Sequence, residues 1–516
     1  MTAIASSEAS IAGLVGSLAL DTLIPDAYAP YRRAVVDATA FFLSRLSAHR
    51  LAEIVAAQRA LPSTAGPAVR AVTLVHCCPT LHKLGQVLAR HRSIIPGFRA
   101  QLQRLESMEP TTSMTEVAAI LHDELGGAVG GELLLGAPAI AEASVAVVVP
   151  FTVRASPAAT TVRGVLKVLK PGIERALLEE LEVWPQVGAF LDDACERFGI
   201  PALEYQATLD DVRDLLVEEV HLEHEQRHLV EAAEAYADMD RVRVPSLLPY
   251  CSPRVTAMSR IDGPKVTSVT HWPPERRRGL AELVVRALIC RPTWSVAPTA
   301  LFHADPHAGN LVAMDDGSLG ILDWSLIGRL GKPERIHIAQ IVLGALSLDP
   351  ARVCQAVAAL AAHGPDQSRL RSVVEDSLRS LRRGALPGLE WLVRLLDAAV
   401  ARAGVRLGRD LMLFRKVLLT LEGVVDDVCA DFPVDQCLVA TAVAQLASEW
   451  PRRMVSAPFS RAHGTHVSNV DLASLVWSWP ATAMRLLSGV GSDVLRSARA
   501  GQLDAGAMPD AARDPT

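Results

Sequence analysis

One short segment carries the residues best suited to chemistry, and it runs from His303 to Asn310 with the sequence His-Ala-Asp-Pro-His-Ala-Gly-Asn. Asn310 follows Asp305 by five residues, and a second acid, Asp323, follows Asp305 by eighteen. Asp305 would orient or deprotonate an attacking hydroxyl group or water. Asn310 and Asp323 offer the hard oxygen ligands that Mg²⁺ prefers when it neutralises nucleotide phosphates. These residue types and spacings predict phosphoryl transfer.

The same order of Asp, Asn and Asp occurs in the catalytic and metal-binding segments of protein-kinase-like folds. Two other interpretations of the segment stay open. In the first, His303, Asp305 and His307 are ligands of a transition metal, although the alternation equally suits the rim of a hairpin and no fourth ligand is nearby. In the second, the segment is a polar turn whose carboxylates cap backbone N–H groups.

A lysine on a β-branched strand is the second candidate, because Lys167 lies within the run Gly164 to Leu169. In kinases a lysine on such a strand contacts the α and β phosphates. Lys170 would point to the opposite face of the strand. Such a lysine needs a carboxylate partner. An acidic run provides four candidates, among which composition alone does not choose: Glu218, Glu219, Glu223 and Glu225.

The elements that must position these residues follow from the apolar periodicity. Helical spacing predicts an all-helical region from Tyr31 to Arg104, and it returns from Gly331 to about Arg499. Between them short β-branched runs indicate strands. The expected strands and helix are Val145–Val149, Val162–Leu169, a helix at Glu174–Leu191, a strand pair at Val242–Val244 and Val255–Met258, and a hairpin at Leu311–Leu322 that turns at Asp315–Gly317. The order is helices, then an α/β core, then helices.

Composition excludes several classes of protein. The chain has 516 residues and a net charge of -6, so no global basic field is available to hold nucleic acid. Eight cysteines without a CxxC pair indicate neither a zinc module nor a disulfide framework, and they favour a reducing cytoplasm. The first basic residue is Arg32, so a secretory signal is not expected.

No membrane span is expected either, because the longest stretch without a charged residue or histidine is 13 residues, short of the roughly 18 to 20 required. Peripheral contact with a membrane stays open, since Leu472 to Leu487 carries Trp477 and Trp479 with one arginine. An ordinary core-packing helix broken at Pro480 is the alternative.

Several blocks together resemble the UbiB/AarF family of atypical protein-kinase-like ATPases. The first is Lys83-Leu84-Gly85-Gln86, which looks like the KxGQ signature of that family. The other blocks follow in the family's order: Ala139 to Ala146, like its alanine-rich nucleotide loop; Val165 to Val168 with Pro171-Gly172; Glu218 to His221 with Glu225; His303 to Asn310 with Asp323; and Phe414 to Val424. The resemblance covers about residues 70 to 430.

The resemblance implies an α+β, bilobal protein-kinase-like fold with a small β-rich N-lobe and a helical C-lobe. It also implies additional helices at both ends of the chain. The expected divisions are an N-terminal helical extension at 1–117, the N-lobe at 118–262, the C-lobe at 263–430, C-terminal helices at 431–499 and a disordered tail at 500–516.

Residue roles follow from the resemblance as well. It implies that Lys167 contacts the phosphates of ATP, that Glu219 is its ion-pair partner and that Glu225 follows in the same block. Asp305 corresponds to the catalytic aspartate, and Asn310 and Asp323 correspond to the Mg²⁺ ligands. The nucleotide loop contains Ala141, Ala143 and Ser144, whose small side chains let backbone N–H groups approach phosphates. Lys83 and Gln86 lie one turn apart on a helix that, in the family, closes over the nucleotide site.

Four positions depart from the family pattern: His221, Val147, Ser325 and Ala308. Ser325 lacks the backbone freedom that glycine would have at this point. Glu142 adds a negative charge near the expected phosphates.

The expected function is that of an enzyme, an atypical kinase that binds Mg-ATP and hydrolyses it or phosphorylates a small molecule. Two alternatives stay open, an ATP-binding pseudokinase scaffold that regulates partner enzymes and an antibiotic-type small-molecule phosphotransferase. The second of these has no reason to contain Lys83 to Gln86. The family's setting implies a phenolic or isoprenoid-quinone-like lipid as a partner, at a membrane surface.

Overall fold

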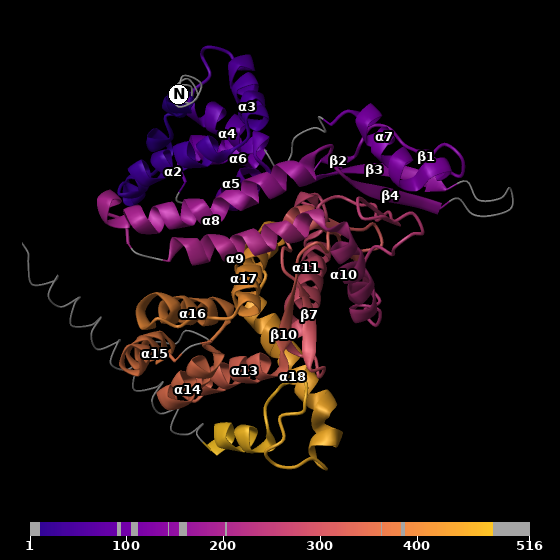
Figure 1. Ribbon diagram of the computed structural model, residues 1–516. Coiled ribbons are helices and arrows are strands. Elements are labelled where there is room, and N and C mark those ends of the chain that lie inside the picture. The colour runs from indigo at the N-terminus through magenta and orange to yellow at the C-terminus, as the bar shows by residue number, and fades with distance from the viewer. Residues whose placement is uncertain are drawn as a thin grey trace, which may run out of the picture. The chain divides into compact units, whose positions relative to one another are not determined.

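Two compact units make up the chain in the computed structural model (Figure 1). The first comprises Met1–Val230 and Pro245–Arg260, and the second comprises Glu231–Val244 and Ile261–Thr516. The structure describes residues 11–89, 94–104, 112–142, 144–153, 162–201, 204–362, 364–382 and 387–477. The finer division into lobes and extensions stays a prediction.

Helices make up the beginning of the first unit, as the apolar periodicity predicted. They are η1 (Leu20–Leu23), η2 (Asp26–Tyr28), α2 (Tyr31–Arg45), α3 (Ala48–Ala60), α4 (Pro67–Cys77), α5 (Pro79–Ala89), α6 (Pro96–Arg104), α7 (Met114–Leu125) and η3 (Gly126–Ala128). Proline at the first position of α4 and α5 suits a helix start, because its missing N–H would have no partner there. The predicted all-helical region is confirmed for the described residues.

A five-stranded antiparallel sheet follows in the first unit. Its strands are β1 (Leu133–Leu135), β2 (Ala141–Glu142), β3 (Ala146–Val153), β4 (Val162–Leu169) and β6 (Val255–Ser259). They lie in the order β1-β3-β4-β6, with β2 also paired to β3. The predicted strand at Val162–Leu169 is confirmed. It lies between two neighbours, with Lys167 opposite Val148 of β3 and Thr256 of β6.

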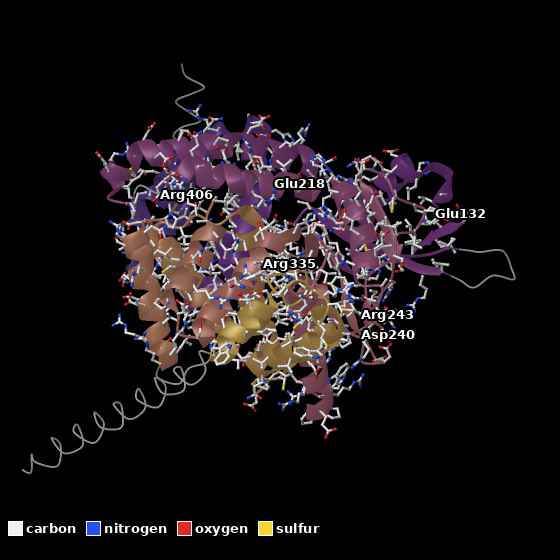
Figure 2. All side chains as sticks on the ribbon, turned by 90° about the horizontal axis from the view of Figure 1, so that it is seen from below. Glu132, Glu218, Asp240, Arg243, Arg335 and Arg406 are labelled. Carbon is white, nitrogen blue, oxygen red and sulfur yellow. The ribbon has the colours of Figure 1, made fainter. Side chains whose placement is uncertain are left out.

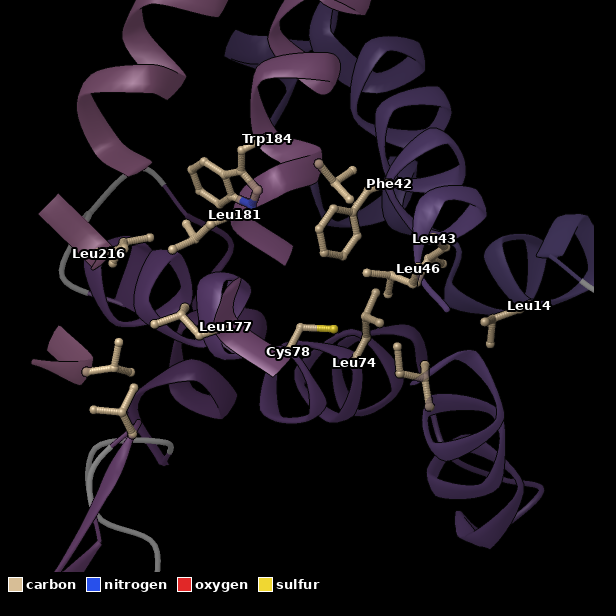
Figure 3. Packing of buried hydrophobic residues seen from close by; sticks show 14 of the residues in the cluster. Leu14, Phe42, Leu43, Leu46, Leu74, Cys78, Leu177, Leu181, Trp184 and Leu216 are labelled. Carbon is tan, nitrogen blue, oxygen red and sulfur yellow. The ribbon is translucent and has the colours of Figure 1, made fainter. Parts of the chain in front are cut away.

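Helices α8 (Ile173–Phe198) and α9 (Tyr205–Val217) lie side by side in the first unit (Figure 1). The amphipathic α8 buries Leu177, Leu181 and Trp184 against α2, α4 and α5. Figure 3 shows this core, which contains Phe42, Cys78, Leu181 and Trp184. The N-terminal helices therefore pack on α8 as one apolar core. After α9 come η4 (Glu218–Val220) and α10 (Leu222–Ala235), whose last residues belong to the second unit.

Two small sheets lie in the second unit. Strands β7 (Thr299–His303) and β10 (Ile327–Gly331) pair antiparallel, and β5 (Val242–Arg243) pairs with β9 (Leu319–Ile321), which pairs with β8 (Leu311–Ala313). The predicted hairpin is confirmed, with Gly317 at a φ of 79° in its turn. Both strands of the predicted pair are present, but their pairing with each other was wrong, because β5 joins β9 and β6 joins β4. Each of the two strands pairs with a strand far away in the sequence, and local sequence patterns do not encode such pairing.

Helices form the rest of the second unit. They are η5 (Val266–Ser268), α11 (Pro274–Val285), η6 (Arg286–Cys290), α12 (Arg291–Thr293), η7 (Ala308–Asn310), α13 (Lys332–Leu346), α14 (Pro350–Leu360), α15 (Gln367–Arg382), α16 (Leu389–Ala403), α17 (Arg409–Val428) and α18 (Val434–Arg453). Arg335 of α13, labelled in Figure 2, is almost fully buried and donates to the carbonyl of Ala297.

Within the described part of the chain, no helix is both long enough and apolar enough to cross a bilayer. The predicted interfacial segment is described only as far as Trp477, whose side chain is exposed. The predicted tail at 500–516 lies outside the described residues.

Candidate functional site

The segment after strand β7 is shaped by one buried imidazole. His303 is 1% exposed, and burial lowers its pKa below the ordinary 6.5. Its Nε2 lies 2.9 Å from the carbonyl oxygen of Leu322, and its Nδ1 lies 3.1 Å from the backbone nitrogen of Asp305. The neutral ring therefore donates from Nε2 and accepts at Nδ1. It ties the Asp305 backbone to the segment before Asp323.

Asn310 and Asp323 lie at the same end of the β8–β9 hairpin. The register pairs Leu311 with Ile321, and the N–H of Leu322 donates to the Asn310 carbonyl at 2.8 Å. The side-chain nitrogen of Asn310 donates to the Asp305 carbonyl at 3.1 Å. Because its nitrogen is engaged in this way, the oxygen Oδ1 of Asn310 is the amide atom suited to a cation. The hairpin thus brings Asp305, Asn310 and Asp323 together within the second unit.

The backbone at Asp323 is unusual, since its φ is 52°, in the left-handed region. Its Oδ1 accepts the N–H of Ser325 at 3.3 Å. Trp324, between these two residues in the chain, is fully buried. The centroid of its ring lies 4.8 Å from the centroid of the His303 ring. Ser325 does not have a positive φ, so its lack of glycine freedom creates no strain there. A positive φ in a non-glycine residue, as at Asp323, is typical of functional sites.

The predicted transition-metal alternative does not survive this geometry. Both ring nitrogens of His303 are engaged by backbone groups, so His303 has no lone pair for a metal. The Nδ1 of His307 accepts the N–H of Gly309 at 3.0 Å and caps the short helix η7. Among the described residues, no group of three or more His, Cys, Asp or Glu side chains is arranged to hold a metal ion.

Lys167 makes a buried ion pair in the first unit. Its side chain is 9% exposed, and its Nζ lies 2.8 Å from Oε1 of Glu225, whose side chain is 3% exposed. A buried ammonium without a carboxylate would be strongly disfavoured, so the pair fixes the lysine. Glu219 lies in η4, but its side chain is outside the described residues, and its pairing with Lys167 stays a prediction. Glu218, labelled in Figure 2, contacts Nδ1 of His224.

The predicted nucleotide loop, Ala139 to Ala146, lies beside Lys170. Ala141 is exposed in β2 and pairs with Val148, Ser144 is buried, and Ala143 lies outside the described residues. Glu142, expected to bring a negative charge toward phosphates, lies 2.7 Å from Nζ of Lys170. It also accepts the backbone N–H of Thr112 at 3.1 Å. Its charge is therefore balanced within the first unit, which weakens that objection to phosphate binding.

A cavity of about 290 Å³ lies next to this ion pair. It is lined by residues of α3, of α4, of the start of α8 and of the loop itself, among them Arg50, His76, Ser144 and Lys170. The predicted nucleotide loop and the N-terminal helices therefore border the same cavity.

Helix α5 carries Lys83, Gln86 and the buried His82. The Lys83 side chain is half-buried, and the side chain of Gln86 lies outside the described residues. Their predicted role over a nucleotide stays a prediction. His82 is 5% exposed, and burial, with Lys170, His76 and Lys83 nearby, lowers its pKa to about 4. Its Nε2 has no hydrogen-bond partner among the described atoms. Protonation of His82 would therefore add an unpaired buried charge.

Because His82 is buried with a lowered pKa, we predict that the protein loses stability in mild acid. The imidazole titrates near 6.5 when unfolded and near 4 when folded, so the unfolded chain binds more protons between these pH values. The free energy of unfolding should fall as the pH drops through this window, by about 2 kcal/mol at pH 5. His82→Gln should remove that part of the loss between pH 7 and pH 5, as measured by urea denaturation. His122→Gln, at an exposed position, is the control, and parallel pH profiles of His82→Gln and wild type would contradict the prediction.

One residue of the site was not predicted from its spacing. Nζ of Lys416, on α17, lies 2.9 Å from Oδ1 of Asp305, 111 residues earlier in the chain. The only signal in the sequence was the block Phe414 to Val424, which resembled a family block without indicating a role.

Comparisons with known proteins bear on the family resemblance. Residues 104–357 match the model of the ABC1 atypical kinase-like domain. An uncharacterized aarF domain-containing protein kinase of Arabidopsis thaliana chloroplasts is 29% identical over 283 residues, which are 52% of this chain and 49% of that protein. A probable protein kinase UbiB of Marinobacter nauticus is 24% identical over 361 residues, which are 67% of this chain and 63% of that protein.

Among solved structures, the complex of Rv3197 with erythromycin from Mycobacterium tuberculosis aligns with a TM-score of 0.46 at 20% identity, and it covers 66% of this chain and 86% of that one.

The match of residues 104–357 to the ABC1 atypical kinase-like domain confirms the resemblance predicted from the motifs. The fold is kinase-like with mixed helices and sheets. The chain spans about half, or less, of the length of the first curated relatives that it matches. Activity, substrates and partners are therefore matters for proposal.

Proposed function

We propose that this chain binds Mg-ATP and transfers the γ-phosphoryl group to water or to a small acceptor. The observation that carries the proposal is the joint placement of Asp305, Asn310 and Asp323 around the β8–β9 hairpin. In this proposal Asp305 accepts the proton of the attacking oxygen, and Lys167 contacts the phosphates. The bilobal organisation with helical extensions, in which Lys83 and Gln86 cover the nucleotide, is part of the same proposal.

The donor atoms fit Mg²⁺. Asn310 can present its side-chain oxygen and Asp323 a carboxylate, and Mg²⁺ prefers such hard oxygen ligands and keeps several waters. When bound, the ion would neutralise charge on the phosphates. The chain's own residues have separate tasks. The backbone links through His303 hold Asp305 relative to the hairpin, and the Glu225 carboxylate holds Lys167 in place.

For the acceptor, we propose a phenolic or isoprenoid-quinone-like lipid, reached at a membrane surface or through partner enzymes. This follows from the resemblance to UbiB/AarF proteins and from relatives that bear the name UbiB. A pseudokinase scaffold would share every motif and differ only in turnover. Turnover of ATP by the purified chain, with and without lipid vesicles and phenolic quinone precursors, separates the two.

Asp323 provides the test of nucleotide binding. Mg-ATP at about 100 times its Kd should stabilise the wild type by about 2.7 kcal/mol, which raises the Tm by several degrees. Asp323→Asn should abolish most of that rise, because the amide removes the negative charge that holds Mg²⁺. Differential scanning fluorimetry with Mg-ATP and with ATP plus EDTA measures the effect.

The matched control is Asp315→Asn, which changes an exposed acid in the turn of the same hairpin and should keep the full rise. Equal stabilisation of Asp323→Asn and wild type would remove Asp323 from the site.

A further inference from the structure

The ion pair between Lys416 and Asp305 joins two distant parts of the second unit. Lys416 Nζ lies 2.9 Å from Asp305 Oδ1, and the two side chains are 41% and 21% exposed. His307 lies nearer in sequence, but its Nε2 is 3.7 Å from Asp305 Oδ2, beyond hydrogen-bond distance. The ammonium of Lys416 on α17 therefore holds Oδ1 of the Asp305 carboxylate.

Helix α17 is fixed at three points close to Lys416. Oδ1 of Asp410 accepts the backbone N–H of Arg329 in β10 at 3.1 Å. The ring of Phe414 meets that of Phe302 in β7 edge to face, with centroids 5.2 Å apart. Arg415 pairs with Asp397 of α16. Since β7 leads directly into the segment that contains Asp305, the same packing that places α17 also places its lysine.

The segment itself contains no permanently charged cation. Between His303 and Asn310 there is no lysine or arginine. His307 is turned into the loop, where its Nδ1 accepts the N–H of Gly309. A permanent positive charge beside Asp305 must therefore come from another element.

We propose that Lys416 is a positioning residue for Asp305 in phosphoryl transfer, a role that rests on the proposed function. By holding Oδ1, Lys416 directs Oδ2 toward the attacking oxygen. The O–H bond of the nucleophile breaks and its proton passes to Oδ2, while its oxygen forms a bond to the γ-phosphorus. The bond from that phosphorus to the bridging oxygen breaks, and its electron pair leaves on ADP.

An ordinary surface ion pair would behave differently. Partly exposed pairs contribute little to stability. A pair that does no more than this would leave turnover unchanged when it is removed. Positioning predicts the opposite, a kinetic effect with little change in stability, because a small displacement of a catalytic group slows the reaction strongly.

The experiment measures kcat, the KM for ATP and the Tm of the full chain, for wild type and for variants at Lys416. Lys416→Met should lower kcat roughly 10- to 100-fold, and the KM and the Mg-ATP-induced rise in Tm should stay within about twofold of wild type. Lys416→Arg should recover most of kcat, because it keeps a cation beside Oδ1. Lys332→Met, which alters another half-buried lysine of the second unit, is the control and should match wild type.

The double variant Asp305→Asn with Lys416→Met shows whether the lysine acts through the carboxylate. Its kcat should equal that of Asp305→Asn alone, because Lys416 then has no carboxylate to position. Two results would overturn the role of Lys416 and leave the proposed function standing. One is an unchanged kcat in Lys416→Met, and the other is that Lys416→Met lowers kcat by the same factor in the wild type and in Asp305→Asn. A wild type that binds Mg-ATP without turnover would overturn both.

Discussion

Replacing Asp305 with Asn is expected to lower ATP turnover about a thousandfold, while Mg-ATP still stabilises the protein. Positioned general bases contribute roughly 10²- to 10⁴-fold to a rate, and an amide of the same shape cannot accept the proton. The backbone of residue 305 keeps its links to His303 and Asn310, so the loop should remain folded. Phosphate release under saturating ATP, and the Tm with and without Mg-ATP, are the two measurements.

The control for this prediction is Asp240→Asn, an exposed acid of the same unit that precedes β5 and lies outside the segment from His303 to Asp323. It should turn over ATP at the wild-type rate. If Asp305→Asn is as fast as wild type, Asp305 is not the base. If the wild type itself binds Mg-ATP but shows no turnover with vesicles or phenolic precursors, the scaffold alternative is correct instead.

Replacing Glu180 with Ala should destabilise the first unit by about 3 to 5 kcal/mol. Glu180 of α8 is fully buried, and its carboxylate accepts the backbone N–H and the hydroxyl of Thr80, at 3.0 and 2.7 Å. It also pairs with Arg50 of α3 at 2.8 Å. The Thr80 hydroxyl in turn accepts Nε1–H of Trp184 at 3.2 Å. The variant would leave the backbone N–H of Thr80 without its buried acceptor, and it would remove one of the two carboxylates that pair with Arg50, the other being that of Glu53.

Urea denaturation followed by far-UV circular dichroism checks this value. The control is Glu182→Ala, which changes an exposed acid two residues later in α8. It should change the free energy of unfolding by less than about 0.5 kcal/mol. A loss below 1 kcal/mol in Glu180→Ala would contradict the prediction. Because Thr80 lies in the first turn of α5, the same variant should loosen the helix that carries Lys83.

Local sequence determined a large part of this protein. Strand β4 with Lys167, the hairpin that carries Asn310 and Asp323, and the N-terminal helices agree with their predictions. Each depends on residues close together in the chain: β-branched runs, a turn with glycine at positive φ, and apolar residues at helical spacing. The family resemblance also depended on short ordered motifs.

Only the tertiary structure decided which charges meet. Of the four acids near residue 220, the structure shows Glu225 on Lys167, although sequence reasoning had named Glu219 first. It also pairs Glu142 with Lys170, and it brings Lys416 to Asp305 across 111 residues. The partner of a charged side chain is set by how distant elements pack, and many carboxylates along a chain satisfy the same local pattern. Spacing can therefore name the candidates, but only packing selects among them, because only a carboxylate that the fold buries beside a cation can offset the desolvation of that cation.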